Sequence, residues 1–169
     1  MEPSKDFSAT PQLTPLEIMR QAFSDMEVAF REDDGTLSTS LCLSTFAACV
    51  TCWGKPDDLV SIVVRLPVRA APQHRAAVGE FLHRLDFNAK RKFWEIDYND
   101  GEIRLSAYTD TLLGPLTDRV FRSMLHCLLL TAETVFPYLM GVLTGRMNPE
   151  FANDQAEAAL VAVWGKDES

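Results

Sequence analysis

The sequence has few of the residues on which catalytic and metal sites are usually built. Its 169 residues include three histidines and four cysteines, and the histidines are scattered, without the Cys/His spacing of zinc ligands. It has no nucleophile elbow, no glycine-rich phosphate loop and no HExxH motif. Paired carboxylates such as Asp33-Asp34 and Asp57-Asp58 fit turns. We therefore expect no catalytic residue, no metal and no cofactor.

Positive charge is also scarce. The chain has 16 Lys and Arg against 24 Asp and Glu, a formal net charge of −8. That field repels phosphate backbones and anionic lipid, so neither nucleic acid nor a membrane surface is an expected partner. No signal-peptide pattern opens the chain, and four cysteines do not make a disulfide framework at this length. These features predict a cytoplasmic protein.

One apolar run, Met124 to Leu143, approaches the length of a membrane span. It carries His126, Glu133 and Pro137, whereas a spanning helix needs about 20 apolar residues with few or no charges. We interpret it as a buried core helix. His126 lies close to the apolar stripe of this helix and is interpreted as a structural residue.

The motif Cys49-Val50-Thr51-Cys52 has the spacing of a redox pair or of half a zinc site. It lies in a strand pattern, in which residues three apart point to opposite faces. The two thiols are therefore not expected to share a metal, and we interpret them as small apolar residues. A redox role is left open. Both alternating sets of residues 46–53 are largely apolar, which predicts a strand covered on both faces.

Helix and strand patterns alternate along the chain in a clear order. A helix begins at the capping residue Thr14, and its apolar stripe continues to Phe30. Strands are predicted near 37–43, 46–53 and 59–66, a helix at 73–85, a hairpin at 92–108, a long helix from 117 that Pro137 bends or breaks, and a helix at 153–164. The order α-β-β-β-α-β-β-α-α predicts an α+β fold, with an antiparallel sheet of about five strands packed against helices. We predict a flexible tail at 1–13, a single domain at 14–147, and a C-terminal helix with a frayed end at 148–169.

The hairpin has the strongest local signal, because Asp100-Gly101 favours a two-residue turn. That turn predicts the cross-strand pairs Tyr98–Ile103, Ile96–Leu105 and Trp94–Ala107 on one apolar face. On the polar face it predicts a pair between Asp97 and Arg104.

Four pieces of sequence occur in a characteristic order: the segment 81–88, the hairpin residues 93–97 with 100–104, Leu116-Thr117, and 137–145. Together they resemble the YbjN-like family of bacterial sensory transduction regulators. The resemblance covers residues 16–145. The family commonly has Asn-like and Gly residues before the hairpin, where this chain has Asp86 and Lys90-Arg91-Lys92. The resemblance implies the fold of type III secretion chaperones, which are small acidic homodimers that hold other polypeptides and do no chemistry.

Two groups of residues are candidate partner-binding sites. The first is the Met- and Phe-rich stripe of the first helix, Met19, Phe23 and Met26, which suits a partner helix or peptide. An ordinary core stripe is the alternative. The second is the basic run Lys90, Arg91 and Lys92, which could dock an acidic partner or the acidic C-terminal segment of the chain itself. A solvated loop is the alternative.

We therefore predict a non-enzymatic protein-binding module, chaperone-like or regulatory. It would act as a homodimer in bacterial signalling or stress response, with itself and an unknown protein as partners. The alternative is a small-ligand-binding domain or an enzyme on the same fold. That alternative predicts a deep polar pocket with perturbed ionisable groups.

Overall fold

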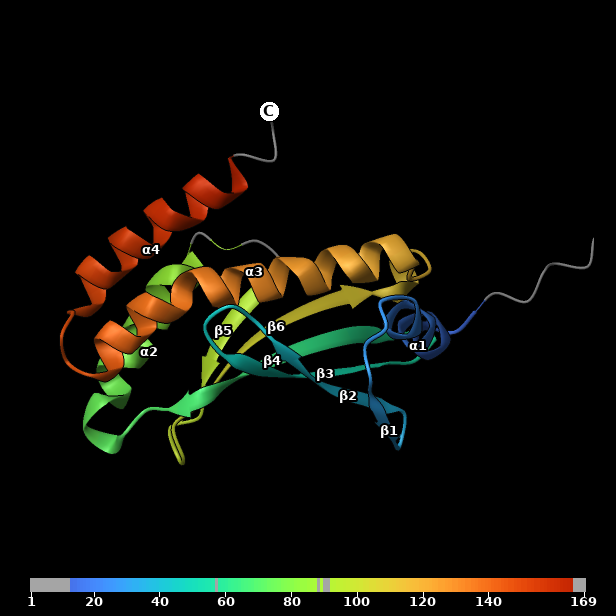
Figure 1. Ribbon diagram of the computed structural model, residues 1–169, viewed down its shortest axis with the longest axis horizontal. Helices are drawn as coiled ribbons and strands as arrows, with labels where there is room; N and C mark the ends of the chain where they lie inside the picture. The colour runs from blue at the N-terminus through green and yellow to red at the C-terminus, as the bar shows by residue number, and fades with distance from the viewer. Residues whose placement is uncertain (1–12, 57, 88, 90–91, 166–169) are drawn as a thin grey trace, which may run out of the picture.

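A computed structural model describes residues 13–56, 58–87, 89 and 92–165. The predicted N-terminal tail, apart from Leu13, and the last four residues lie outside this range. The elements follow the chain in the order α1 (Pro15–Asp25), β1 (Arg31–Asp33), β2 (Thr36–Cys42), β3 (Ala47–Gly54), β4 (Leu59–Arg69), a 3-10 turn (Pro72–His74), α2 (Arg75–Phe87), β5 (Lys92–Ile96), β6 (Glu102–Asp110), a second 3-10 turn (Thr111–Leu113), α3 (Asp118–Leu143) and α4 (Pro149–Trp164) (Figure 1).

The six strands form one antiparallel sheet in the order β1-β2-β3-β4-β6-β5. The predicted α+β class is therefore confirmed, with one strand more than expected. The first four strands follow one another along the chain. β6, and not β5, lies beside β4, so β5 is an outer strand.

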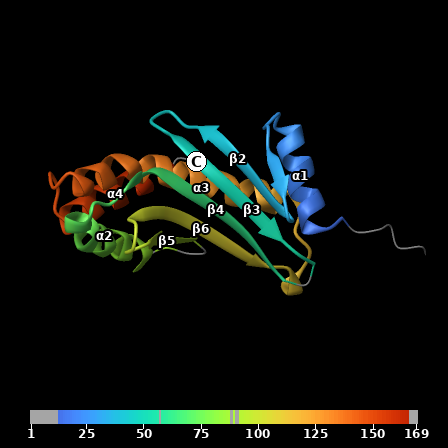
Figure 2. The ribbon, with the colours of Figure 1, turned by 90° about the horizontal axis from the view of Figure 1, so that it is seen from below.

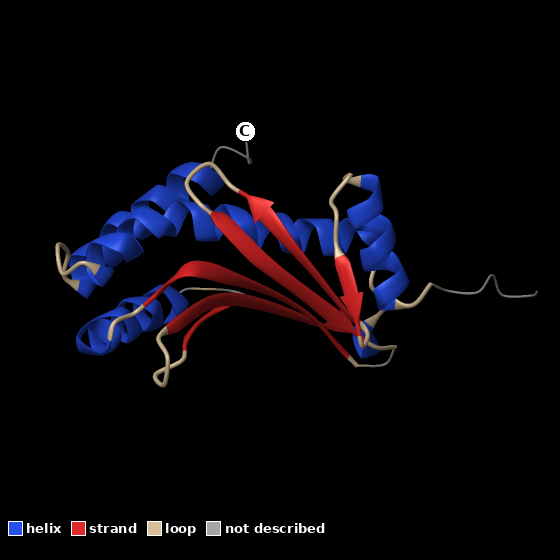
Figure 3. Cartoon of the chain, turned by 60° about the horizontal axis from the view of Figure 1, so that its bottom comes forward, coloured by secondary structure: helices blue, strands red, loops and turns tan. Residues whose placement is uncertain are grey.

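All four helices leave one face of the sheet uncovered. α1 and α3 lie on the same face, where α3 contacts β4 and β6, and α1 contacts β2 and β3. α2 lies beside β5, and α4 packs on α2 and α3. Seen from the opposite side, the strands stand in front of α3 and no helix crosses them (Figures 2 and 3).

The core lies between the sheet and the helices. Its largest fully buried side chains include Phe23 of α1, Phe81 of α2 and Phe121 of α3. α3 is long and apolar enough to cross a membrane by length and composition alone. In the fold it buries nine residues against its neighbours, as predicted for a core helix.

Pro137 neither breaks α3 nor ends it, so the predicted division of this helix is wrong. α3 runs without interruption from Asp118 to Leu143. Pro137 faces solvent, where water can satisfy the carbonyl that loses its helical donor, while Val135 and Leu139 are fully buried on either side. Packing of the neighbouring turns outweighs the local cost of the proline.

α1 ends five residues before the end of the predicted stripe. The chain leaves the helix at Glu27, which has a φ of 57°, and the Val28 N–H donates to the Phe23 carbonyl at 2.9 Å. Phe30 still packs on Phe23, with ring centroids 5.8 Å apart. The stripe therefore continues in space after the helix has ended. The residues that follow form β1 and a two-residue turn at Asp34-Gly35, with φ of 43° and 71°.

The β5–β6 hairpin forms in a register that is shifted by two residues from the predicted one. Trp94 pairs with Leu105, and Ile96 pairs with Ile103. The turn is longer than expected because Asp97 and Asp100 accept backbone N–H groups inside it, at 2.7 and 2.9 Å. A shift of two keeps every side chain on its predicted face, but Arg104 now pairs with Glu95 instead of Asp97.

Candidate functional site

The predicted stripe of α1 lies mostly in the core. Met19 and Phe23 are fully buried, and Phe23 meets Phe121 edge to face at 5.5 Å between ring centroids. Met26 is half-buried and packs against the same core. Met19 and Phe23 are therefore core residues, as the alternative interpretation of the stripe predicted, and they are not available to a partner.

The predicted basic run is represented by one residue, because Lys90 and Arg91 lie outside the described residues. The Lys92 side chain points towards the helices. Its Nζ donates to Thr131 Oγ1 at 2.9 Å and lies 5.7 Å from the ring centroid of Trp164. Lys92 therefore links β5 to α3 and α4.

The two cysteines of the Cys-x-x-Cys motif lie on opposite faces of β3, as their spacing predicts. Cys49 is exposed, whereas Cys52 is buried, and burial raises the pKa of the Cys52 thiol to about 12. A thiol with so high a pKa is a poor nucleophile and a poor metal ligand at neutral pH. Within the described ranges, no three His, Cys, Asp or Glu residues are grouped so that they could hold a metal ion.

The uncovered face of the sheet carries exposed aromatic side chains from three strands. Trp53 of β3 and Tyr108 of β6 are each 38% exposed, and Phe93 of β5 is 49% exposed. The rings of Phe93 and Tyr108 lie 6.2 Å apart. We call this side of β2 to β6 the open face. The sequence predicted that β3 is covered on both sides, and this prediction is wrong for the chain alone, since Ala47, Cys49 and Trp53 are exposed.

Small side chains lie between these rings. Ser61 of β4 pairs with Trp53 on one side and with Tyr108 on the other. Ser61 is 1% exposed, and its hydroxyl has no hydrogen-bond partner among the described residues. A buried hydroxyl without a partner costs free energy. The next row on the open face, Val63 and Ser106, is also buried.

Charges on the open face are balanced within it. Arg65 donates to Thr51 Oγ1 at 2.7 Å and lies 3.4 Å from a Glu102 oxygen. Arg104, directly opposite Arg65, lies 3.3 Å from a Glu95 oxygen. Each carboxylate offsets the electrostatic repulsion between the neighbouring guanidinium groups of Arg65 and Arg104. The open face is therefore close to neutral in a chain whose net charge is −8.

The β5 edge of the sheet is closed by α2. The Trp94 N–H, which points away from β6, donates to both oxygens of the Asp86 carboxylate at 2.9 and 3.0 Å. Burial raises the pKa of Asp86, although the hydrogen bonds from Trp94 act in the opposite direction. Asp86 is one of the residues at which the sequence departs from the pattern of the family that it resembles, and here it occupies a free strand edge.

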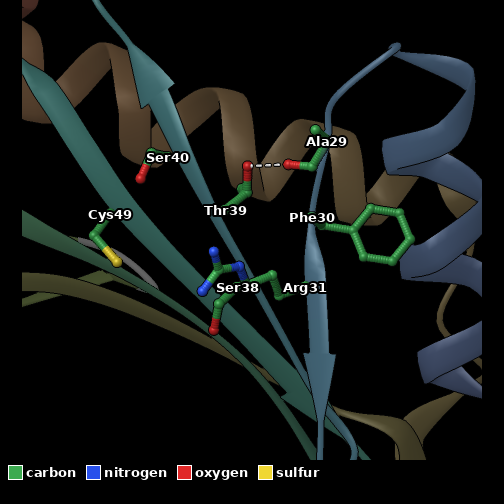
Figure 4. Close-up of a pocket in the computed structure, with 7 residues that line it drawn as sticks. All are labelled: Ala29, Phe30, Arg31, Ser38, Thr39, Ser40 and Cys49. Atoms are coloured by element: carbon green, nitrogen blue, oxygen red, sulfur yellow. Dashed lines mark hydrogen bonds between the residues drawn. The ribbon is translucent and has the colours of Figure 1, made fainter.

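The opposite edge of the sheet contains a hollow of about 550 Å³ between β1 and β2 (Figure 4). Its lining residues are Ala29, Phe30, Arg31, Ser38, Thr39, Ser40 and Cys49. The pairing of β1 with β2 ends at Arg31–Ser38, and the Thr39 hydroxyl of β2 donates to the carbonyl of Ala29, in the segment before β1, at 2.6 Å. Sequence analysis missed this hollow because it missed β1. The dipeptide Asp34-Gly35 was the signal that could have revealed the hairpin.

Comparison with known proteins shows similarity at the level of the fold. No family model and no curated protein matches the sequence. YbjN from E. coli, a proposed transcription regulator, is similar with a TM-score of 0.49 and 14% identity, over 68% of this chain and 82% of that one. A chain of the ExoT–SpcS complex from Pseudomonas aeruginosa is similar with a TM-score of 0.45 and 20% identity, over 70% of this chain and 96% of that one.

At these identities the similarity concerns the fold, and the function has to be inferred from the surfaces of this chain. One of these two solved structures is a YbjN protein, the kind of protein that the sequence resembles.

Proposed function

We propose that this protein is a non-enzymatic protein-binding module that uses the open face of its sheet. The observation that carries the proposal is the set of exposed rings of Trp53, Tyr108 and Phe93 on a face that none of the four described helices covers. Aromatic residues and arginine are enriched at protein interfaces, and exposed apolar patches often mark them. The sequence of β3, apolar on both sides, also suits a strand whose second face is covered by a partner.

The charge balance of the open face supports a polypeptide partner over a nucleic acid. Arg65 and Arg104 already interact with carboxylates of the same face. Binding to a phosphate backbone requires unpaired positive charge, because the affinity comes from the release of counterions. A neutral face with aromatic rings and polar side chains instead suits burial against another protein.

For at least part of the open face, the partner we propose is a second copy of this chain. We also propose that the protein is a cytoplasmic bacterial regulator or chaperone. Two copies with a net charge of −8 repel each other, and that repulsion is weakest where the facing surfaces are neutral. A two-fold axis would bring the same patch of each copy together. Trp53 of one copy could then cover the unpaired hydroxyl region around Ser61 of the other.

Site-specific photocrosslinking would test the proposal. A photoreactive phenylalanine analogue in place of Tyr108 should crosslink to a discrete protein partner or to a second copy in the native host. The same analogue in place of Gln155, which is exposed on α4, is the control and should give no such product. If the two positions give the same products, or if neither gives any and the protein is monomeric by light scattering, the open face is not the binding surface.

A further inference from the structure

We propose that the hollow between β1 and β2 binds the free C-terminus of a partner polypeptide, which adds to the β2 edge as a short antiparallel strand. The inference rests on the proposed function only in that the ligand is a protein. It assigns a separate site at the β1–β2 edge of the sheet, a direction of binding and a chemical group that is recognised.

The first observation is a segment of strand edge that β1 leaves free. β1 pairs with β2 only from Asp33 to Arg31, so no strand of the described part of the chain lies beside β2 from Thr39 to Cys42. Across the β2–β3 pair, the Leu43 N–H donates to the Phe46 carbonyl at 2.8 Å. Backbone groups alternate in direction along an antiparallel strand, so those of Ser40 and Cys42 point outwards to the free edge. A peptide strand can pair with such an edge.

The second observation is the place where this free edge ends. An added strand can pair with at most the four residues from Thr39 to Cys42, because β1 occupies the edge from Ser38 onwards. An added chain must therefore stop or turn away at Arg31. A chain terminus fits this position without the turn that an internal segment would need.

The third observation is the charge at that point. Arg31 is exposed and lines the hollow, and its guanidinium reaches over Ser38 (Figure 4). Among the described residues, its side chain has no carboxylate within 4.0 Å and no hydrogen-bond acceptor. In contrast, Arg20, Arg65, Arg69, Arg84, Arg104 and Arg122 all form ion pairs. The Ser38 and Ser40 hydroxyls in the hollow are likewise unpaired within the described structure.

Only a ligand strand that runs antiparallel to β2 brings a group of opposite charge to Arg31. β1 runs antiparallel to β2 and leads away from the hollow towards the Asp34-Gly35 turn. A ligand strand antiparallel to β2 runs in the same direction as β1, so its C-terminal end meets Arg31. Its carboxylate would form a charge-assisted pair with the guanidinium. A parallel strand would bring an N-terminal ammonium to Arg31, which like charges disfavour.

A peptide library with free C-termini tests the proposal. Hexapeptides of randomised sequence, displayed with a free carboxyl end, would be selected on the full chain, and selected sequences would be synthesised as acids and as amides. We expect the acids to bind about tenfold or more tightly than the amides by fluorescence polarisation, as for a lost hydrogen bond to a charged group. Arg31→Gln should weaken the acids by a similar factor and leave the amides unchanged.

Arg119→Gln is the matched control, because Arg119 is an exposed arginine on α3 without an ion pair in the described structure. Alkylation of Cys49, which lines the hollow, gives a second measurement, since bound peptide should slow it while Cys127 reacts at an unchanged rate. Failure to select any peptide, equal binding of acids and amides, or full binding by Arg31→Gln would overturn the inference. Photocrosslinking at Tyr108 would be unaffected by that failure, so the proposed function would be judged separately.

Discussion

The two edges of the sheet meet solvent in opposite ways. At the β5 edge, α2 lies alongside the strand and Asp86 accepts the outward Trp94 N–H. The hairpin there is also anchored, since the Ala70 N–H donates to the Gly101 carbonyl at 2.8 Å. At the other edge, β1 pairs with β2 only from Thr36 to Ser38, and no described atom lies within 4 Å of a Cβ added at Gly35 in the β1–β2 turn. Proteins usually protect their strand edges. The outer edge of β2 is covered by β1 from Thr36 to Ser38 and is free from Thr39 to Cys42, so this part of β2 is a candidate for pairing with a strand of a partner.

The largest expected effect comes from the two Asp-Gly turns. Gly101 has a φ of 79°, and a Cβ added there would lie 2.1 Å from the Ala70 carbonyl oxygen. Gly101→Ala should therefore lower the free energy of unfolding by about 2–4 kcal/mol, from backbone strain and overpacking together. Urea denaturation followed by circular dichroism would measure the loss.

Gly35→Ala is the matched variant at the open edge. Gly35 also has a positive φ, but no atom lies within 4 Å of the added Cβ. Only the backbone strain remains, and the expected loss is about 1–2 kcal/mol. Equal losses at the two glycines would show that the anchoring of the β5–β6 hairpin does not contribute.

An effect smaller than that of Gly101→Ala is expected where the closed edge is opened. Asp86→Ala removes both acceptors of the Trp94 N–H and should cost about 1–3 kcal/mol of unfolding free energy. It should also increase concentration-dependent self-association, because a bare strand edge can pair with another chain. Asp86→Asn keeps one acceptor oxygen and should lose less on both counts, as measured by denaturation and analytical ultracentrifugation.

The pH dependence of Asp86 gives a third comparison. Burial raises the pKa of Asp86 above its unfolded value, which is about 4. Between those two pKa values the folded state binds more protons than the unfolded state, so this carboxyl makes stability fall as pH rises. Relative to Asp86→Asn, the unmodified protein should lose stability as the pH increases through that interval. A difference between the two proteins that does not change with pH would contradict the raised pKa.

Glu17, Glu32 and Asp100 act in the opposite sense, because hydrogen bonds lower the pKa of each carboxyl. Their contribution is present above the unfolded pKa and is lost as the pH falls through the folded one. These residues are common to both proteins in the comparison and cancel in the difference.

The smallest effect requires no substitution. Hydrogen exchange should be fast at the Ser40 and Cys42 amides, which face the free edge. It should be slower at the Trp94 amide, which donates a hydrogen bond to the Asp86 carboxylate. Nuclear magnetic resonance would resolve these amides individually. A peptide bound in the hollow should slow exchange at Ser40 and Cys42 and leave Trp94 unchanged.

The features that were predictable from the sequence are those that depend on local chemistry. The Thr14 cap, in which the Glu17 carboxylate accepts the Thr14 N–H at 2.7 Å, follows from spacing alone. The opposite faces of Cys49 and Cys52 follow from spacing in the same way. The end of α1 at Asp25 was not predictable from periodicity, because Phe30 continues the apolar stripe in space from a residue outside the helix.

The candidate sites depend on long-range arrangement, and sequence reasoning located neither of them. Trp53, Tyr108 and Phe93 come from three separate strands, and their grouping requires the pairing of β4 with β6. Arg31 is polar and next to a run of charges, so it fitted a turn as well as a strand. Its importance depends on the length of β1 relative to β2, which no local pattern specifies.

The place of β6 between β4 and β5 also has a consequence for how the chain folds. β1 to β4 form by pairing neighbours along the sequence, and β5 with β6 form a hairpin, so both units close short loops. Joining them pairs Leu59 with Asp110 and Arg69 with Glu102, across the whole of α2. Contacts between residues so distant in sequence slow folding, and we expect the docking of the hairpin on β4 to be the rate-limiting event.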